Sequence, residues 1–93
     1  MKAIWNEIVI ADSDRTIEKD GKHYFPPNTV DKKYLEDSRT HKDSPDKGEA
    51  SFYHVQVKGK VKQDGAWYYP DPKEDATDIR GYIAFSDEIE LKK

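Results

Sequence analysis

Two short segments carry side chains whose types could support catalysis. Asp12 and Asp14 form a D-x-D pair, and paired carboxylates can hold a catalytic metal ion. Ser44 and Lys47 lie in a polar segment, where a hydroxyl could attack a substrate and an ammonium could contact an anion or a carbonyl group. Because no glycine-rich phosphate loop accompanies either segment, the sequence predicts no particular reaction, and the catalytic residues stay unknown.

The three histidines do not complete either segment. A relay of Ser44, His54 and Asp46 can be written down, but a chain so rich in serine and aspartate allows many such combinations. His23, His41 and His54 lack the helical i, i+4 spacing of a metal-binding pair, and there is no cysteine to complete a zinc site. The sequence therefore predicts neither a metal site nor a cofactor.

Aromatic residues next to prolines suggest a binding site. Two segments place aromatic residues directly before a proline, namely Tyr24-Phe25-Pro26 and Trp67-Tyr68-Tyr69-Pro70. Neighbouring side chains of an extended segment point to opposite faces, so Trp67 and Tyr69 share one face while Tyr68 takes the other. The rings either belong only to the core or also line a pocket that stacks a planar ligand. The ligand-binding residues predicted from this pattern and from the Lys-Gly pair are Trp5, Tyr24, Lys47, Trp67 and Tyr69.

Length and charge exclude several classes of protein. Ninety-three residues leave room for one domain, which we expect to cover residues 1–93. The formal net charge of −3 argues against binding to duplex nucleic acid. No apolar run is long enough for a membrane span, the first residues form no signal-peptide core, and the absence of cysteine excludes disulfides. We expect a cytoplasmic protein, without a membrane partner, that is a monomer or a homodimer.

The apolar composition favours strands. The chain has seven Ile, five Val and six Tyr against two Leu, and β-branched and aromatic residues suit a half-buried pleated surface. Alternation is clear in 51–58, where Tyr53, Val55 and Val57 share one face. The prediction is a mainly β, antiparallel two-sheet domain, tent-like or sandwich-like, with one or two short helices.

Turn residues locate the hairpins. Asp20-Gly21 is a strong two-residue hairpin signal, because both positions tolerate a positive φ. Asn6-Glu7 predicts a weaker hairpin, since glutamate is a poor left-handed residue. Lys58-Gly59 and Asp64-Gly65 predict two further turns.

Three segments are not expected to be strands. Residues 28–35 predict a short helix capped by Asn28 or Thr29, and residues 71–74 resemble a capped helix start with Pro72 at the first helical position. Residues 36–49 are charged and show no hydrophobic pattern, so they predict a long loop.

Short pieces spread over nearly the whole chain form a set when taken in order. They are Ala3 to Trp5 with Asn6, Ile10-Ala11 with Ser13, Gly21 with Tyr24 to Pro27, Lys47-Gly48 with Ala50 and Tyr53, Ala66 to Pro70 with Pro72, and Ile79, Gly81, Ala84 and Phe85. This set resembles one small β-domain family, a domain of unknown function that carries a nucleotidyltransferase-like label. The resemblance implies a compact, mainly antiparallel domain, similar to the tent-like double-sheet folds of methionine sulfoxide reductase and of the cereblon ligand-binding domain.

One departure from the family pattern concerns the polar segment. Where the family reads Cys-Pro-Trp-Lys-Gly, this chain reads Ser44-Pro45-Asp46-Lys47-Gly48. An activity that used the family's thiol would be lost here or would depend on a hydroxyl, which is a poor nucleophile without a base beside it.

Three functions are therefore open at the level of sequence. The first is binding of a small planar or polar ligand in an aromatic-lined cleft. The alternative is a transferase or hydrolase that acts through the segment around Ser44 and Lys47, and a further alternative is a protein-interaction module.

Overall fold

Nine strands and three short 3-10 helices make up the chain, and the computed structural model describes all residues 1–93. No helix has the length and apolarity that a membrane crossing requires. The strands are β1 (Lys2–Trp5), β2 (Ile8–Asp12), β3 (Ile17–Lys19), β4 (Lys22–Tyr24), β5 (Leu35–Ser44), β6 (Gly48–Val57), β7 (Lys60–Tyr68), β8 (Ile83–Phe85) and β9 (Glu90–Lys92), and the 3-10 helices are η1 (Pro27–Thr29), η2 (Lys32–Tyr34) and η3 (Glu74–Ile79).

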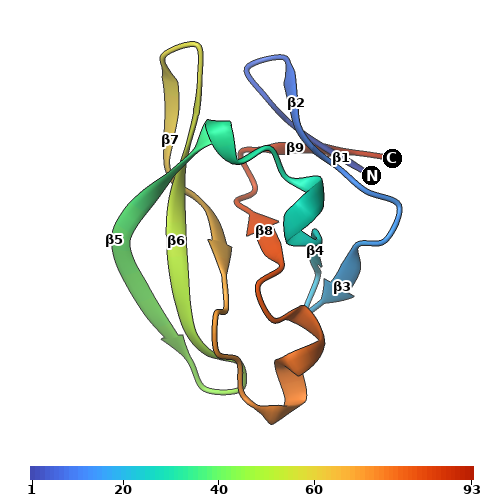
Figure 1. Cartoon of the computed structure of the whole chain (residues 1–93), viewed down its shortest axis with the longest axis vertical. Helices are drawn as coiled ribbons and strands as arrows, with labels where there is room; N and C mark the ends of the chain where they lie inside the picture. Colours follow the sequence, from blue (N-terminus) through green and yellow to red (C-terminus); the bar gives the residue numbers. More distant parts are fainter.

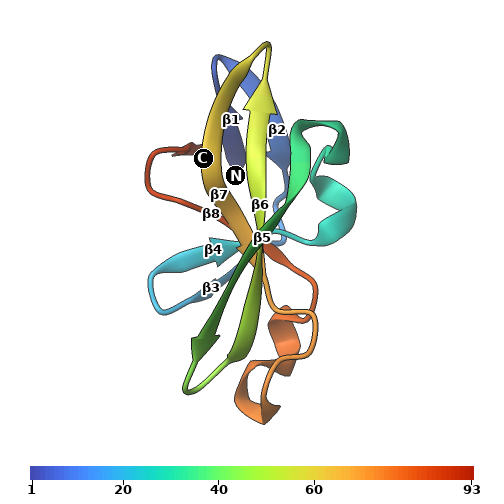
Figure 2. The ribbon, with the colours of Figure 1, turned by 90° about the vertical axis from the view of Figure 1, so that its left-hand side faces the viewer.

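The strands form three antiparallel sheets (Figure 1). The largest has the order β5-β6-β7-β8, a second has the order β2-β1-β9, and β3 pairs with β4 in a small hairpin. The expected mainly antiparallel β-domain is confirmed, although its strands divide into three hydrogen-bonded sheets where two were predicted. Figure 2 shows the β3–β4 hairpin and the two turns η1 and η2 on opposite sides of the long strands.

Three of the four predicted turns connect hairpin strands. Asp20 and Gly21 both have a positive φ between β3 and β4, and Lys58 with Gly59 does the same between β6 and β7. Asn6 and Glu7 join β1 to β2, also with a positive φ at both positions. The fourth prediction is wrong: Asp64-Gly65 is a bulge inside β7, where the pairing with β6 shifts register, because both flanking segments continue the same ladder.

The predicted loop over residues 36–49 is instead most of a long hairpin. β5 is an edge strand with one neighbour and mostly exposed side chains, so burial imposes no alternating pattern on its sequence. The helix predicted over 28–35 is replaced by η1 and η2, and the side chain of Asp31 caps the second. The helix predicted at Pro72 begins two residues later, at Glu74, without a side-chain cap.

Side chains of β6, β7 and β8 contribute to two separate hydrophobic clusters. Along β7 and just beyond it, Tyr68 packs on the first cluster, while Trp67 and Tyr69 belong to the second. The predicted split of these three rings between two faces is confirmed. The first cluster contains Ala3, Ile10, Ala11, Phe25, Val30, Val55, Val57, Ala66, Ile83, Phe85 and Ile89, and the second contains Tyr24, Ala50, Tyr69, Ala76, Ile79 and Ala84.

Candidate functional site

An open cavity of about 380 Å³ lies beside the second cluster. Its size is within the usual range for small-ligand pockets. Four of the five predicted binding residues border it, and only Trp5 does not. The lining residues are Lys19, Asp20, Lys22, Tyr24, Lys42, Asp43, Ser44, Lys47, Ala50, Phe52, Trp67 and Tyr69.

The aromatic wall of the cavity comes from cross-strand and inter-sheet contacts. Phe52 of β6 is directly opposite Trp67 of β7, with ring centroids 6.1 Å apart and planes tilted by 41°. Tyr24 comes from the β3–β4 hairpin and lies 6.4 Å from the ring of Tyr69. The indole Nε1 of Trp67 donates to the hydroxyl of Tyr24 over a long 3.4 Å. Four rings from three segments of the chain are thus held next to one opening.

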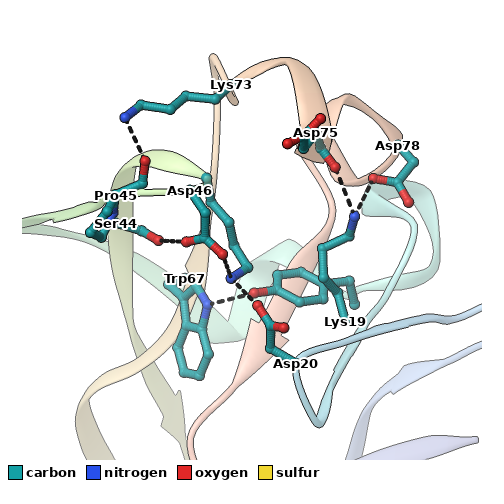
Figure 3. Close-up of polar contacts among 11 residues, drawn as sticks. Lys19, Asp20, Ser44, Pro45, Asp46, Trp67, Lys73, Asp75 and Asp78 are labelled. Atoms are coloured by element: carbon teal, nitrogen blue, oxygen red, sulfur yellow. Dashed lines mark hydrogen bonds and ion pairs between the residues drawn. The ribbon is translucent and has the colours of Figure 1, made fainter.

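Lys47 places an ammonium group at the turn between β5 and β6. Its side chain is only 11% exposed, and its Nζ forms ion pairs with Asp20 and, at 3.3 Å, with Asp46 (Figure 3). The hydrogen bond to Asp20 raises the pKa of Lys47, against the opposing effect of burial. The amine is therefore protonated at neutral pH and can act as a cation or a hydrogen-bond donor.

Gly48 allows the Lys47 turn to pack against the chain before η3. Its φ is +106°, and an added Cβ would lie 3.3 Å from the backbone oxygen of Asp71. In the same contact, the backbone N–H of Lys73 donates to the oxygen of Lys47 at 2.8 Å. The glycine thus permits a close approach between two backbone segments, which positions the lysine.

The Ser44 hydroxyl has a carboxylate as its partner and no histidine. It donates to Asp46 at 2.7 Å, and this hydrogen bond lowers the pKa of Asp46 (Figure 3). His54 is engaged elsewhere, because its Nδ1 accepts from the backbone N–H of Asp64 at 3.0 Å. The relay of Ser44, His54 and Asp46 is therefore not formed.

Trp5 lies in a different part of the molecule. Its Nε1 donates to the backbone oxygen of Lys60 at 3.0 Å, and the Lys60 ammonium lies 4.7 Å from the centroid of its ring. Its side chain packs against the first hydrophobic cluster. The structure thus separates Trp5 from the other four predicted residues, because β1 pairs with β2 and β9 and does not approach the cavity.

Sequence reasoning missed several lining residues, most notably Phe52, Lys22 and Lys42. Phe52 carried a usable signal, because a large ring on the face of a strand opposite Val55 and Val57 has no place in the same core. Lys42 could not be assigned to the cavity from the sequence, because its segment was expected to be a loop. Lys22 was hidden because the β3–β4 hairpin reaches the cavity only through tertiary packing.

The acidic pair borders a second and wider cavity of about 700 Å³. Asp12 and Asp14 share it with the guanidinium-bearing Arg15 and with Met1, whose amino group donates to the backbone oxygen of Ser13 at 2.7 Å. No group of three or more histidine, cysteine, aspartate or glutamate side chains is arranged to hold a metal ion. Two carboxylates beside two cationic groups are a poor set of metal ligands.

Comparison with known families identifies one match that covers almost the whole chain. The family model NTP_transf_9, described as a domain of unknown function (DUF427), matches residues 1–92. The chain belongs to this family, as its sequence suggested. No curated protein matches it significantly.

Proposed function

We propose that the protein binds a small planar or polar ligand in the cavity bordered by Tyr24, Phe52, Trp67 and Tyr69. The observation that carries the proposal is the meeting of these rings with the nearly buried ammonium of Lys47 at one opening. Apolar walls with a few oriented polar groups are the usual composition of a small-ligand site. The half-buried rings of Phe52 and Trp67 would stack on the planar part of the ligand, and Lys47 would donate to a carbonyl group.

Binding explains the polar groups better than catalysis does. A protonated Lys47 is no amine nucleophile, and the lowered pKa of Asp46 makes this carboxylate a weak base for the Ser44 hydroxyl. The transferase or hydrolase alternative rests on the family label, and the interaction module has no specific contact in its favour. The cytoplasmic location and the oligomeric state stay predictions from the sequence.

Tryptophan fluorescence can test the proposal directly. In a Trp5→Phe protein, Trp67 is the only indole, and we expect at least one of three ligand classes (nucleosides, nucleotides or cyclic imides) to change its emission and to raise the melting temperature. A ligand at a hundred times its Kd would add about 2.7 kcal/mol to the free energy of unfolding. The matched Trp67→Phe protein, which keeps Trp5, should show no emission change. If none of these classes and no aromatic carboxylate alters either signal, the proposal is refuted.

A further inference from the structure

The lining of the cavity contains more lysines than aspartates, although the chain as a whole is acidic. The protein carries a formal net charge of −3, yet four lysines and two aspartates line this cavity. A concave surface that carries an excess of one sign concentrates ligands of the other sign. This excess of lysines indicates the chemical class of the ligand, an inference that rests on the function proposed above.

Two of the four lysines are neutralised by neighbouring carboxylates. Lys47 is shared between Asp20 and Asp46, so that this corner of the cavity carries more negative than positive charge. Lys19 pairs with Asp78 at 3.0 Å and also donates to the backbone oxygen of Asp75. An anion would gain little at either place, whereas a neutral carbonyl could still accept a hydrogen bond from Lys47.

Lys22 and Lys42 differ from that pair of lysines because their ammonium groups lie over the aromatic wall. The Nζ of Lys22 is 5.7 Å from the centroid of Trp67, and the Nζ of Lys42 is 5.7 Å from that of Phe52. No carboxylate oxygen lies within 4.0 Å of the Lys42 ammonium nitrogen, so Lys42 forms no ion pair. The partner of Lys22 is Asp87, whose side chain is 89% exposed, so water screens that pair strongly.

We propose that the cavity selects planar aromatic carboxylates, with the ring against Trp67 and Phe52 and the carboxylate at Lys22 and Lys42. An aromatic ring gains contact with these two half-buried rings, and the carboxylate replaces water around two ammonium groups. A neutral aromatic lacks the charge, an aliphatic carboxylate lacks the stacking, and an aromatic cation is repelled by both lysines. The ligand must therefore carry both a planar aromatic ring and a carboxylate.

Four probes separate these requirements: 2-naphthoate, 2-naphthamide, 2-naphthylmethylammonium and cyclohexanecarboxylate. In ¹⁵N-labelled protein the indole N–H signals of Trp67 and Trp5 report on the cavity and on a remote control site, respectively. We expect 2-naphthoate to shift the Trp67 signal with a Kd about five- to tenfold below that of 2-naphthamide, and to leave Trp5 unmoved. The other two probes should bind more weakly still, and raising the salt concentration should reduce the preference for the carboxylate.

Lys42→Gln should bring the Kd values for 2-naphthoate and 2-naphthamide together, with a melting temperature close to that of the wild type. Lys60→Gln is the matched control, because it also removes an ammonium from above a tryptophan but outside the cavity. Equal binding of amide and carboxylate by the wild type, or a preference that survives in Lys42→Gln, overturns the charge selection and leaves the binding proposal standing. If none of the four probes moves the Trp67 signal, this inference falls, and the nucleoside, nucleotide and cyclic-imide titration decides the binding proposal separately.

Discussion

The two tryptophans have similar local surroundings but occupy regions of different kinds. Each indole has a lysine ammonium near its ring and each donates its N–H to an oxygen. At the closed end, defined here by Trp5, Asn6, Val57 and Lys60, the Trp5 bond measures 3.0 Å, and Asn6 adds a second bond to the oxygen of Val57 at 3.0 Å. At the open end, defined by the residues that line the 380 Å³ cavity, the Trp67 bond measures 3.4 Å.

This difference shows that residue type alone does not decide the role of a ring. At the closed end two hairpins meet: backbone oxygens of the β6–β7 hairpin accept from Trp5 and Asn6 of the β1–β2 hairpin, so the indole stabilises the fold. At the open end the β3–β4 hairpin approaches the sheet without filling the space, so that Trp67 borders the cavity. The following predictions test the comparison in order of decreasing effect.

The largest effect is expected for the tryptophans themselves. Trp5→Ala should lower the free energy of unfolding by about 3 kcal/mol, because it removes a half-buried ring and a hydrogen bond between two hairpins. Trp67→Ala should lower it by only about 1–2 kcal/mol, because the ring borders open space. Urea unfolding of both variants measures the difference. Equal losses would show that the two ends are equivalent.

Two glycines provide the next test. Gly48→Ala should cost about 2 kcal/mol, because the new Cβ combines a positive φ with a contact against the Asp71 backbone at the open end. Gly59→Ala, at the β6–β7 turn of the closed end, has a positive φ but no neighbour within 4 Å and should cost about 1 kcal/mol. Thermal unfolding compares them. A larger loss for Gly59→Ala would contradict the close packing of the Lys47 turn.

The carboxylate of Asp64, in the bulge of β7, allows a test of stability against pH. Asp64 accepts from Ser38 at 2.5 Å and from Thr40 at 2.8 Å, and the Ser38 hydrogen bond is the main cause of its lowered pKa. A carboxyl whose pKa is lower in the folded state stabilises the fold above its unfolded pKa, and this stabilisation is lost as the pH falls through the folded value.

Asp64→Asn should therefore lower the free energy of unfolding by about 1 kcal/mol at pH 7, because a neutral amide is a weaker acceptor for the two hydroxyls. The difference from wild type should shrink between pH 5 and pH 2, about the ordinary pKa of 3.8. Denaturant unfolding across this range is the measurement. A pH-independent difference would show that the charge of Asp64 is immaterial.

The smallest effect on stability is expected for Ser44→Ala. Loss of the hydroxyl donor should raise the pKa of Asp46 toward its ordinary value of 3.8, because the bond to Ser44 is the main cause of its lowering. NMR titration of the Asp46 carboxyl measures the change, and Ser51→Ala is the control. An unchanged pKa would mean that the local turn, and not the hydroxyl, stabilises the carboxylate.

Local chemistry predicted the hairpins and the division of rings between faces. Asp20-Gly21 forms the expected turn because both residues tolerate a positive φ, and in Lys58-Gly59 the glycine supplies this tolerance. The β5 strand could not be predicted, since an exposed edge strand needs no apolar alternation. Asp64-Gly65 shows the same limit, because a positive φ suits a bulge as well as a turn.

The sequence by itself determined the β class and placed Trp67 and Tyr69 on one face, because strand propensity and alternation act between near neighbours. The tertiary structure decided that Trp67 borders a cavity while Trp5 joins two hairpins. The cavity brings together residues from β4, β5, β6 and the end of β7, and the packing of segments so distant in sequence is settled only when the whole domain folds.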